Sequence, residues 1–201
     1  MKTIFAGFLL FITVQIGFAQ GTVCENSYIH FDKFFGTSSS AKDIESPLDI
    51  PVRKAGFNYG TDNKGNEMAV IHIWGEGGTD EQPHYYLSLI FSKSQLSKKG
   101  IIKIPLIDSW SGSGFGSSGL DAKGSGIVKF KHIYDYGAAQ WTNWGGHKKG
   151  NSEGEIIIEV KDENTICGSV TFKTYADGSS LNPDYYSQGS VKNFIAKKIE
   201  E

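Results

Sequence analysis

The residues in this sequence that could do chemistry are aromatic side chains set among glycines. Residues 134–147 place two tyrosines and two tryptophans beside Asp, Gln and Asn side chains. Flat rings flanked by such groups can stack on sugars or anchor a protein contact. We therefore expect a ligand site built from Trp110, Tyr134, Tyr136, Trp141, Asn143 and Trp144. The alternative is that these rings fold back as lids over apolar surface at the ends of the domain.

A metal site receives little support from the histidines. His72 and His84 lie on neighbouring expected strands and could approach each other. No H-x-H, H-E-x-x-H or C-x-x-C spacing accompanies them, and no third ligand can be named. We interpret them as half-buried strand histidines and expect neither a metal nor a cofactor.

Signatures of catalysis are weak. Residues 114–119 match G-x-G-x-x-G, but no helix follows to receive a pyrophosphate, and the G-x-S-x-G nucleophile elbow does not occur. A glycosidase needs two carboxyl groups facing each other across a sugar. Glu153, Glu155 and Glu159 instead share one face of an expected strand, which is typical of a solvated surface. Whether the protein is an enzyme stays open, and a non-catalytic role is favoured.

The elements that must position these residues are strands. Apolar side chains recur every second residue, 25 of the 201 residues are glycine, and helical periods are scarce outside the N-terminus. We expect strands at residues 28–35, 67–74, 84–91, 101–107, 126–136, 153–161, 165–175 and 191–199. One short helical turn, capped by Ser94 and ended by Gly100, is expected at residues 95–99.

The expected fold is all-β. Residues 67–74 put Met68, Val70, His72 and Trp74 on one face and the intervening Ala and Ile side chains on the other. Residues 108–124 and 137–152 lack a regular period and are expected to be loops. Successive hairpins without crossover helices indicate an antiparallel β-sandwich with little helix, and a β-barrel is the alternative.

The N-terminus predicts export. Residues 1–19 combine a charged start, an apolar run and small residues before Ala19, so we expect a signal peptide cleaved after Ala19 and a single β domain over residues 20–201. No later run is long enough for a membrane span. With 20 Lys and Arg against 22 Asp and Glu, the chain lacks the charge of a nucleic-acid-binding protein.

The two cysteines bear on the compartment. In a secreted or periplasmic protein Cys24 and Cys167 would form a disulfide. The alternative is a lipid anchor at Cys24, although residues 21–23 match a lipobox poorly.

The clearest hairpin carries a resemblance. Residues 154–160 read Gly-Glu-Ile-Ile-Ile-Glu-Val and residues 164–172 read Asn-Thr-Ile-Cys-Gly-Ser-Val-Thr-Phe. This hairpin resembles the late hairpin of small exported or lipid-anchored all-β envelope proteins of Gram-negative bacteria, and residues 189–194 could supply the Gly-led terminal strand. The resemblance implies location and fold class, and it supplies no catalytic residue.

The leading hypothesis is therefore an exported, non-catalytic β protein that binds a glycan or an envelope protein through its aromatic, Gly-rich loops. A hydrolase of envelope polysaccharide and a structural or assembly subunit are the alternatives. The sequence leaves the ligand and the oligomeric state open.

Overall fold

The computed structural model describes eight segments of the chain in detail. They are residues 27–34, 47–62, 65–77, 84–106, 125–133, 141–145, 153–176 and 186–200. Trp110, Tyr134 and Tyr136 of the expected ligand site lie outside these segments, as do Cys24 and residues 1–19.

The described residues are almost entirely strand, which confirms the all-β expectation. The elements are β1 (Tyr28–Lys33), β2 (Leu48–Thr61), β3 (Glu67–Gly75), β4 (Tyr85–Ser92), the 3₁₀ helix η1 (Lys93–Ser97), β5 (Ile101–Pro105), β6 (Gly126–Ile133), β7 (Trp141–Gly145), β8 (Glu153–Asp162), β9 (Thr165–Ala176) and β10 (Tyr186–Lys198). None of the described helical residues forms a segment long and apolar enough to cross a bilayer.

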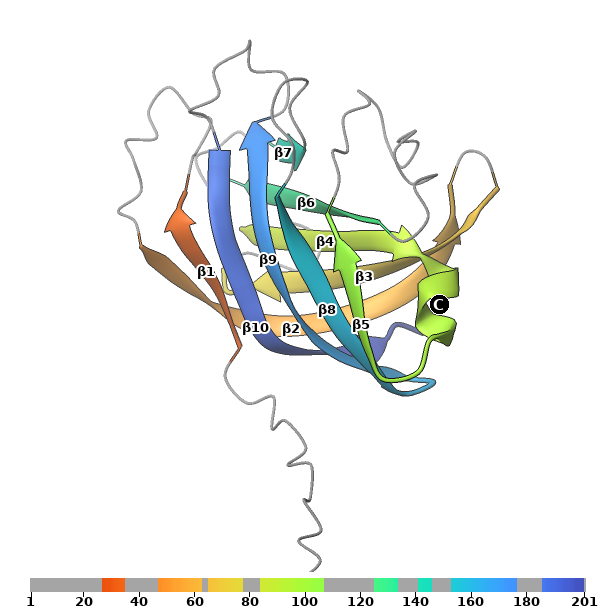
Figure 1. Ribbon diagram of the computed structural model, residues 1–201. Coiled ribbons are helices and arrows are strands. Elements are labelled where there is room, and N and C mark those ends of the chain that lie inside the picture. Colours follow the sequence, from red (N-terminus) through yellow and green to blue (C-terminus); the bar gives the residue numbers. More distant parts are fainter. Residues whose placement is uncertain are drawn as a thin grey trace, which may run out of the picture.

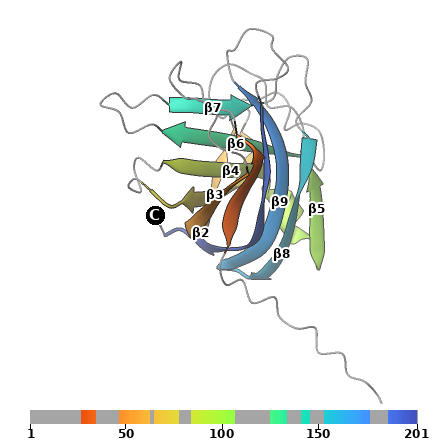
Figure 2. The ribbon, with the colours of Figure 1, turned by 90° about the vertical axis from the view of Figure 1, so that its left-hand side faces the viewer.

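The strands form one sheet that curls into a nearly closed barrel. Its order is β1-β10-β2-β3-β4-β6-β7-β9-β8-β5, with additional pairings between β1 and β2 and between β10 and β9. Neighbouring strands are antiparallel except β10 and β2, which run parallel where Lys197 and Lys198 pair with Gly56 and Phe57. Figure 1 shows β5, β8, β9 and β10 crossing in front of β2, β3, β4 and β6, and Figure 2 shows the same two halves from the side.

This closure corrects the preferred sandwich in favour of its barrel alternative. β2 has 14 residues and β10 has 13, long enough for each to pair with more than one strand along its length. β2 pairs first with β1 and then with β3, while β10 pairs with β1, β9 and β2. The two halves are therefore joined by backbone hydrogen bonds, whereas a sandwich keeps two separate sheets.

The interior of the barrel is a packed core. Six phenylalanine side chains are fully buried: Phe31, Phe57, Phe91, Phe130, Phe172 and Phe194. The ring of Phe31 lies 5.1 Å from the rings of both Phe34 and Phe130. Ile and Leu from β3, β4, β5 and β8 fill the remaining space. Side chains therefore fill this interior, as they do in small barrels.

Several expected elements are confirmed and others are corrected. The expected strands matching β1, β3, β4, β5, β6, β8, β9 and β10 are present, and β10 begins earlier than expected. β2 was not predicted, and β7 lies inside the expected loop at residues 137–152. The helical turn is present, but it begins at Lys93 after Ser92, so Ser94 is not its cap. Gly100, with φ +80°, follows it as expected.

Candidate binding site on the outer face of the sheet

The expected loop site is only partly described, and its described part is a strand. Trp141, Asn143 and Trp144 belong to β7, which pairs with β6 on one side and with the end of β9 on the other. The prediction that these three residues lie in a loop is therefore wrong. Trp and Thr favour extended backbone, and the strands on both sides supply hydrogen-bond partners that a loop would lack.

A different group of rings gathers on the outer face of β3 and β4. Trp74 pairs directly with Tyr86 across the β3–β4 hairpin, and their ring centres are 5.5 Å apart. His72, two positions before Trp74, lies 5.5 Å from the Trp74 ring and stacks on the Tyr86 ring at 5.8 Å. On the adjacent strand, the Lys54 Nζ lies 4.6 Å from the centre of the Trp74 ring. We call Lys54, Asn58, His72, Trp74 and Tyr86 the outer aromatic cluster.

Hydrogen bonds hold this cluster in one arrangement. His72 Nε2 lies 2.9 Å from Asn58 Oδ1, and His72 Nδ1 contacts the Tyr86 hydroxyl. An amide oxygen can only accept, so Nε2 carries the proton and donates to Asn58. Nδ1 is then the acceptor, and the Tyr86 O–H donates to it. The imidazole is thus fixed from both sides, which holds the neighbouring rings in place.

Burial keeps both members of the hydrogen-bonded pair uncharged. Desolvation lowers the pKa of His72 from its ordinary 6.5 to about 4. Desolvation also raises the pKa of Tyr86, and a hydrogen bond from Ser88 acts in the opposite direction. Near neutral pH the cluster therefore presents a neutral imidazole, a neutral phenol and an indole beside the Lys54 ammonium group.

The strand alternation explains why these rings lie together. Met68, Val70, His72 and Trp74 occupy one face of β3, as the sequence predicts, while Ala69, Ile71 and Ile73 enter the core. Met68 and Val70 join Ile90 and Ile127 in a second, smaller buried apolar cluster on the outer face. His72 and Trp74 are half-buried and continue this face toward the other end of β3. One end of the outer face is thus apolar, and the other is aromatic and polar.

A hollow of about 690 Å³ adjoins the cluster at Asn58. Its other lining residues come from β2, the β8–β9 turn and the end of β10: Tyr59, Asn164, Lys197, Lys198, Ile199 and Glu200. Ile199 lies over Gly56, where an added Cβ would come within 2.8 Å of the isoleucine side chain. Gly56 is therefore required for the end of β10 to approach β2 this closely. Asn58 therefore belongs to both the aromatic cluster and the hollow, and Ile199 lines the hollow beside it.

His72 and His84 do not approach each other. His72 pairs with Ser88, while His84 precedes β4 and lies against Gly77. The suggested approach of His72 to His84 is therefore wrong, because the hairpin register places them at different levels. Across the described segments, no three His, Cys, Asp or Glu side chains are grouped to hold a metal ion.

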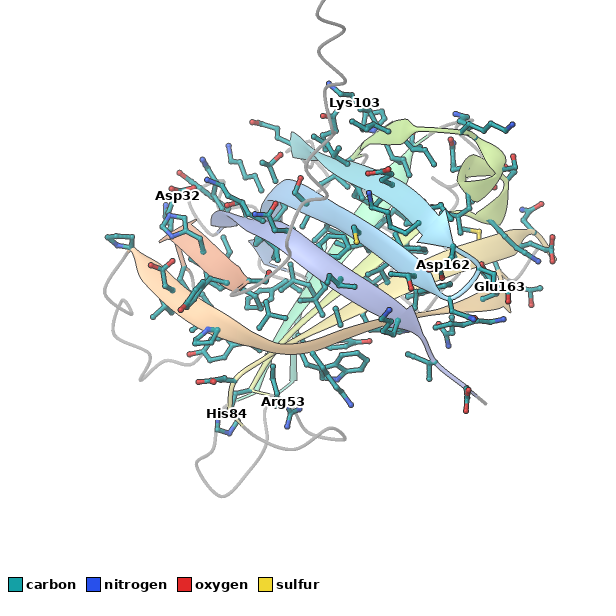
Figure 3. The ribbon with its side chains drawn as sticks, turned by 90° about the horizontal axis from the view of Figure 1, so that it is seen from below. Asp32, Arg53, His84, Lys103, Asp162 and Glu163 are labelled. Atoms are coloured by element: carbon teal, nitrogen blue, oxygen red, sulfur yellow. The ribbon has the colours of Figure 1, made fainter. Side chains whose placement is uncertain are left out.

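The carboxylates of β8 lie on the surface beside lysines. Glu153 forms an ion pair with Lys173 at 3.5 Å, and Glu159 forms one with Lys161 at 2.6 Å. This agrees with the interpretation of that face as solvated. Figure 3 shows Asp162 and Glu163 farther along, at the β8–β9 turn. Asp121 and Asp135 lie outside the described segments.

A second polar group lies on β1 and β2. His30 Nδ1 is 2.6 Å from Asp49 Oδ1, and its Nε2 is 3.3 Å from Asp32 Oδ1. The hydrogen bond to Asp49, together with the charges of both carboxylates, raises the pKa of His30. Since His30 is exposed, this group is a surface ion pair of small energetic weight.

Comparison with known proteins was made by family, by sequence and by structure. No family model, curated protein or solved structure matches this chain. The interpretation of the outer aromatic cluster as a binding site therefore depends on its geometry alone.

Sequence reasoning found part of this cluster. It placed His72 and Trp74 on one face of a strand, but it did not single out Trp74, Tyr86, Asn58 or Lys54 as site residues. The signal that could have identified Tyr86 was the hairpin itself, whose register brings that ring opposite Trp74. Asn58 and Lys54 gave no such signal, because their strand was not predicted.

Proposed function

We propose that this chain is an exported, non-catalytic binding protein whose outer aromatic cluster binds a sugar ring. The observation that carries the proposal is the half-exposed Trp74 indole, held beside His72 and Tyr86, with the Lys54 Nζ over the ring and the His72–Asn58 hydrogen bond beside it. An apolar ring face surrounded by polar groups suits a pyranose, which presents C–H groups on its faces and hydroxyls around its rim. A site on paired strands is also rigid, so little ordering is needed on binding.

The packed core supports a surface site over an internal one. Ligand-carrying barrels enclose a cavity, whereas six buried phenylalanines fill this interior. Catalysis has less support than binding, because Glu153 and Glu159 on β8 pair with lysines and share one face of the strand, so they do not face each other as glycosidase carboxylates do.

A glycan array tests the proposal. We expect the wild-type protein to bind a subset of glycans and the Trp74→Ala variant to lose that binding. Ile101→Ala is the control, because Ile101 is an apolar residue 69% exposed on β5, a strand that pairs with β8 and not with the strands of the cluster. Circular dichroism of each variant establishes that it is folded. Failure of the wild type to bind any glycan, or equal binding by Trp74→Ala, would refute the proposal.

Export belongs to the same proposal. The N-terminal sequence supports cleavage after Ala19 and delivery to the periplasm or the exterior. N-terminal sequencing of the exported protein should begin at Gln20. A mature chain that begins with a lipid-modified Cys24 would instead establish the anchored alternative.

An oxidising compartment would permit the Cys24–Cys167 disulfide. Ser27 is fixed by two hydrogen bonds of 2.8 Å, one from the Val52 N–H and one to the Lys192 carbonyl. Asn193, next to Lys192, lines the same hollow as Cys167. Cys24 lies outside the described segments, so its pairing with Cys167 is supported by the expected compartment.

A further inference from the structure

The charges beside the outer aromatic cluster point to the class of sugar it binds. A β-bulge between Val52 and Lys54 interrupts the pairing of β2 with β3, and both Arg53 and Lys54 are exposed there. Figure 3 shows the Arg53 side chain projecting from the outer surface of the barrel. A bulge redirects side chains in this way, so two cations lie at the Trp74 end of the cluster.

Two further cations lie across β2. Gly56 pairs with His72 on one side and with Lys197 on the other, so these three residues form one row across adjacent strands. Lys197 and Lys198 both line the hollow that begins at Asn58. The Lys197 Nζ is 2.9 Å from Thr165 Oγ1, and the Lys198 Nζ lies 6.0 Å from the Tyr59 ring. We call the outer surface that runs from Trp74 to this hollow the path. Lysines therefore lie at both of its ends.

Among the described residues, acidic side chains lie at the margin of this path. The outward positions of β2, β3 and β4 on this face carry Lys, Gly, Asn, Met, Val, His, Trp, Tyr, Ser and Ile, and no Asp or Glu within the described strands. Glu76 follows the end of β3, Glu200 lines the hollow, and Asp162 and Glu163 precede Asn164, another lining residue. The described outward positions between Trp74 and the hollow thus carry cations and no carboxylate, although the whole chain has a net charge of −2.

We infer that the outer aromatic cluster and its neighbouring hollow bind an acidic glycan, one that carries carboxylate or sulfate groups. This inference rests on the proposed function. One sugar ring lies on Trp74 with its anionic group toward Lys54 and Arg53, and the chain continues past Ile199 toward Lys197 and Lys198. Lys54 and Asn58 are four residues apart, so the path is about 13 Å long and holds a short oligosaccharide.

Isothermal titration calorimetry with three probes tests the inference. Polygalacturonate oligosaccharides carry carboxylates, dextran sulfate carries sulfates, and dextran is neutral. We expect binding of at least one acidic probe, weakened when salt is raised from low to high concentration because exposed charges are screened. We expect no comparable binding of dextran. Which acidic probe binds more tightly distinguishes carboxylate from sulfate recognition.

Variants separate this inference from the proposed function. Lys54→Gln and the double variant Lys197→Gln, Lys198→Gln should each weaken acidic-probe binding about fivefold, as expected for loss of exposed charge contacts. Trp74→Ala should weaken it about tenfold or more. Lys103→Gln is the matched control. Lys103 is exposed on β5, so this variant should bind like the wild type.

The outcomes are distinct. Binding of dextran that Trp74→Ala abolishes and Lys54→Gln leaves unchanged would overturn the acidic specificity and keep the sugar site. Acidic-probe binding that Lys103→Gln weakens as much as Lys54→Gln would also overturn the inference, since general charge would then explain it. No binding of any probe would overturn the acidic specificity, while the glycan array decides the sugar site. Binding of a probe that Trp74→Ala leaves unchanged would overturn both proposals.

Discussion

Replacing His72 with Gln should reduce the acid sensitivity of the fold. Burial lowers the pKa of His72 from 6.5 to about 4. Between these values the unfolded chain binds a proton at this site and the folded protein does not, so stability rises with pH across that window. At about 1.4 kcal/mol per pKa unit, the free energy of unfolding of the wild type should fall by up to about 3 kcal/mol between pH 6.5 and pH 4 through this group alone.

Urea unfolding of both proteins at several pH values measures this term. His72→Gln keeps a hydrogen-bonding side chain but cannot titrate, so contributions from carboxylates cancel in the comparison. The difference in the free energy of unfolding between the two proteins should shrink as pH falls from 6.5 to 4. Parallel pH curves for wild type and variant would refute the assignment of His72 as a desolvated, neutral imidazole.

His30 should not interfere with that measurement. Its pKa is raised, so its contribution is fully present below 6.5 and is lost as pH rises through the folded value. The stability contributions of the two histidines therefore vary in different pH ranges. A His30→Asn variant should lower stability by a constant amount below about pH 6.5 and change its pH dependence only above that value.

Three further predictions concern the core, a glycine and the cysteines. Phe31→Ala should lower the free energy of unfolding by about 3–5 kcal/mol in urea unfolding, because Phe31 is fully buried; a loss below about 1 kcal/mol would contradict the packed interior. Gly154→Ala should destabilise by about 1–3 kcal/mol in the same assay, since Gly154 has φ +131° and an added Cβ would lie 2.0 Å from the Thr171 carbonyl oxygen; wild-type stability would contradict that backbone conformation. Mass spectrometry of exported protein after alkylation without reductant should find Cys24 and Cys167 unmodified, and alkylation of both would contradict the disulfide.

Period-two alternation explains which strands could be predicted. In β3, β4, β8 and β9 apolar side chains recur at every second position, and each pair is joined by a short polar connection. β2 escaped prediction because Pro51 and two glycines interrupt it and the bulge at Arg53 shifts its alternation by one residue. The barrel closure depends on β10 meeting β2 in parallel, a pairing between segments about 140 residues apart that no local pattern encodes.

The site was only partly predictable for the same reasons. His72 and Trp74 share a face by alternation alone, so their association follows from the sequence. Lys54 and Asn58 reach them only through the unpredicted β2. Rings near glycines favoured the segment at residues 134–147, whereas the described part of that segment is strand.

The most direct test of the outer aromatic cluster is an NMR titration of the indole N–H signals. The chain has four tryptophans, and the signal lost in Trp74→Phe identifies Trp74. On addition of the glycan that the protein binds, the Trp74 signal should shift progressively to saturation. A Trp74 signal that stays in place while those of Trp110, Trp141 and Trp144 shift would contradict this account and move the site to the aromatic segments that the sequence first indicated.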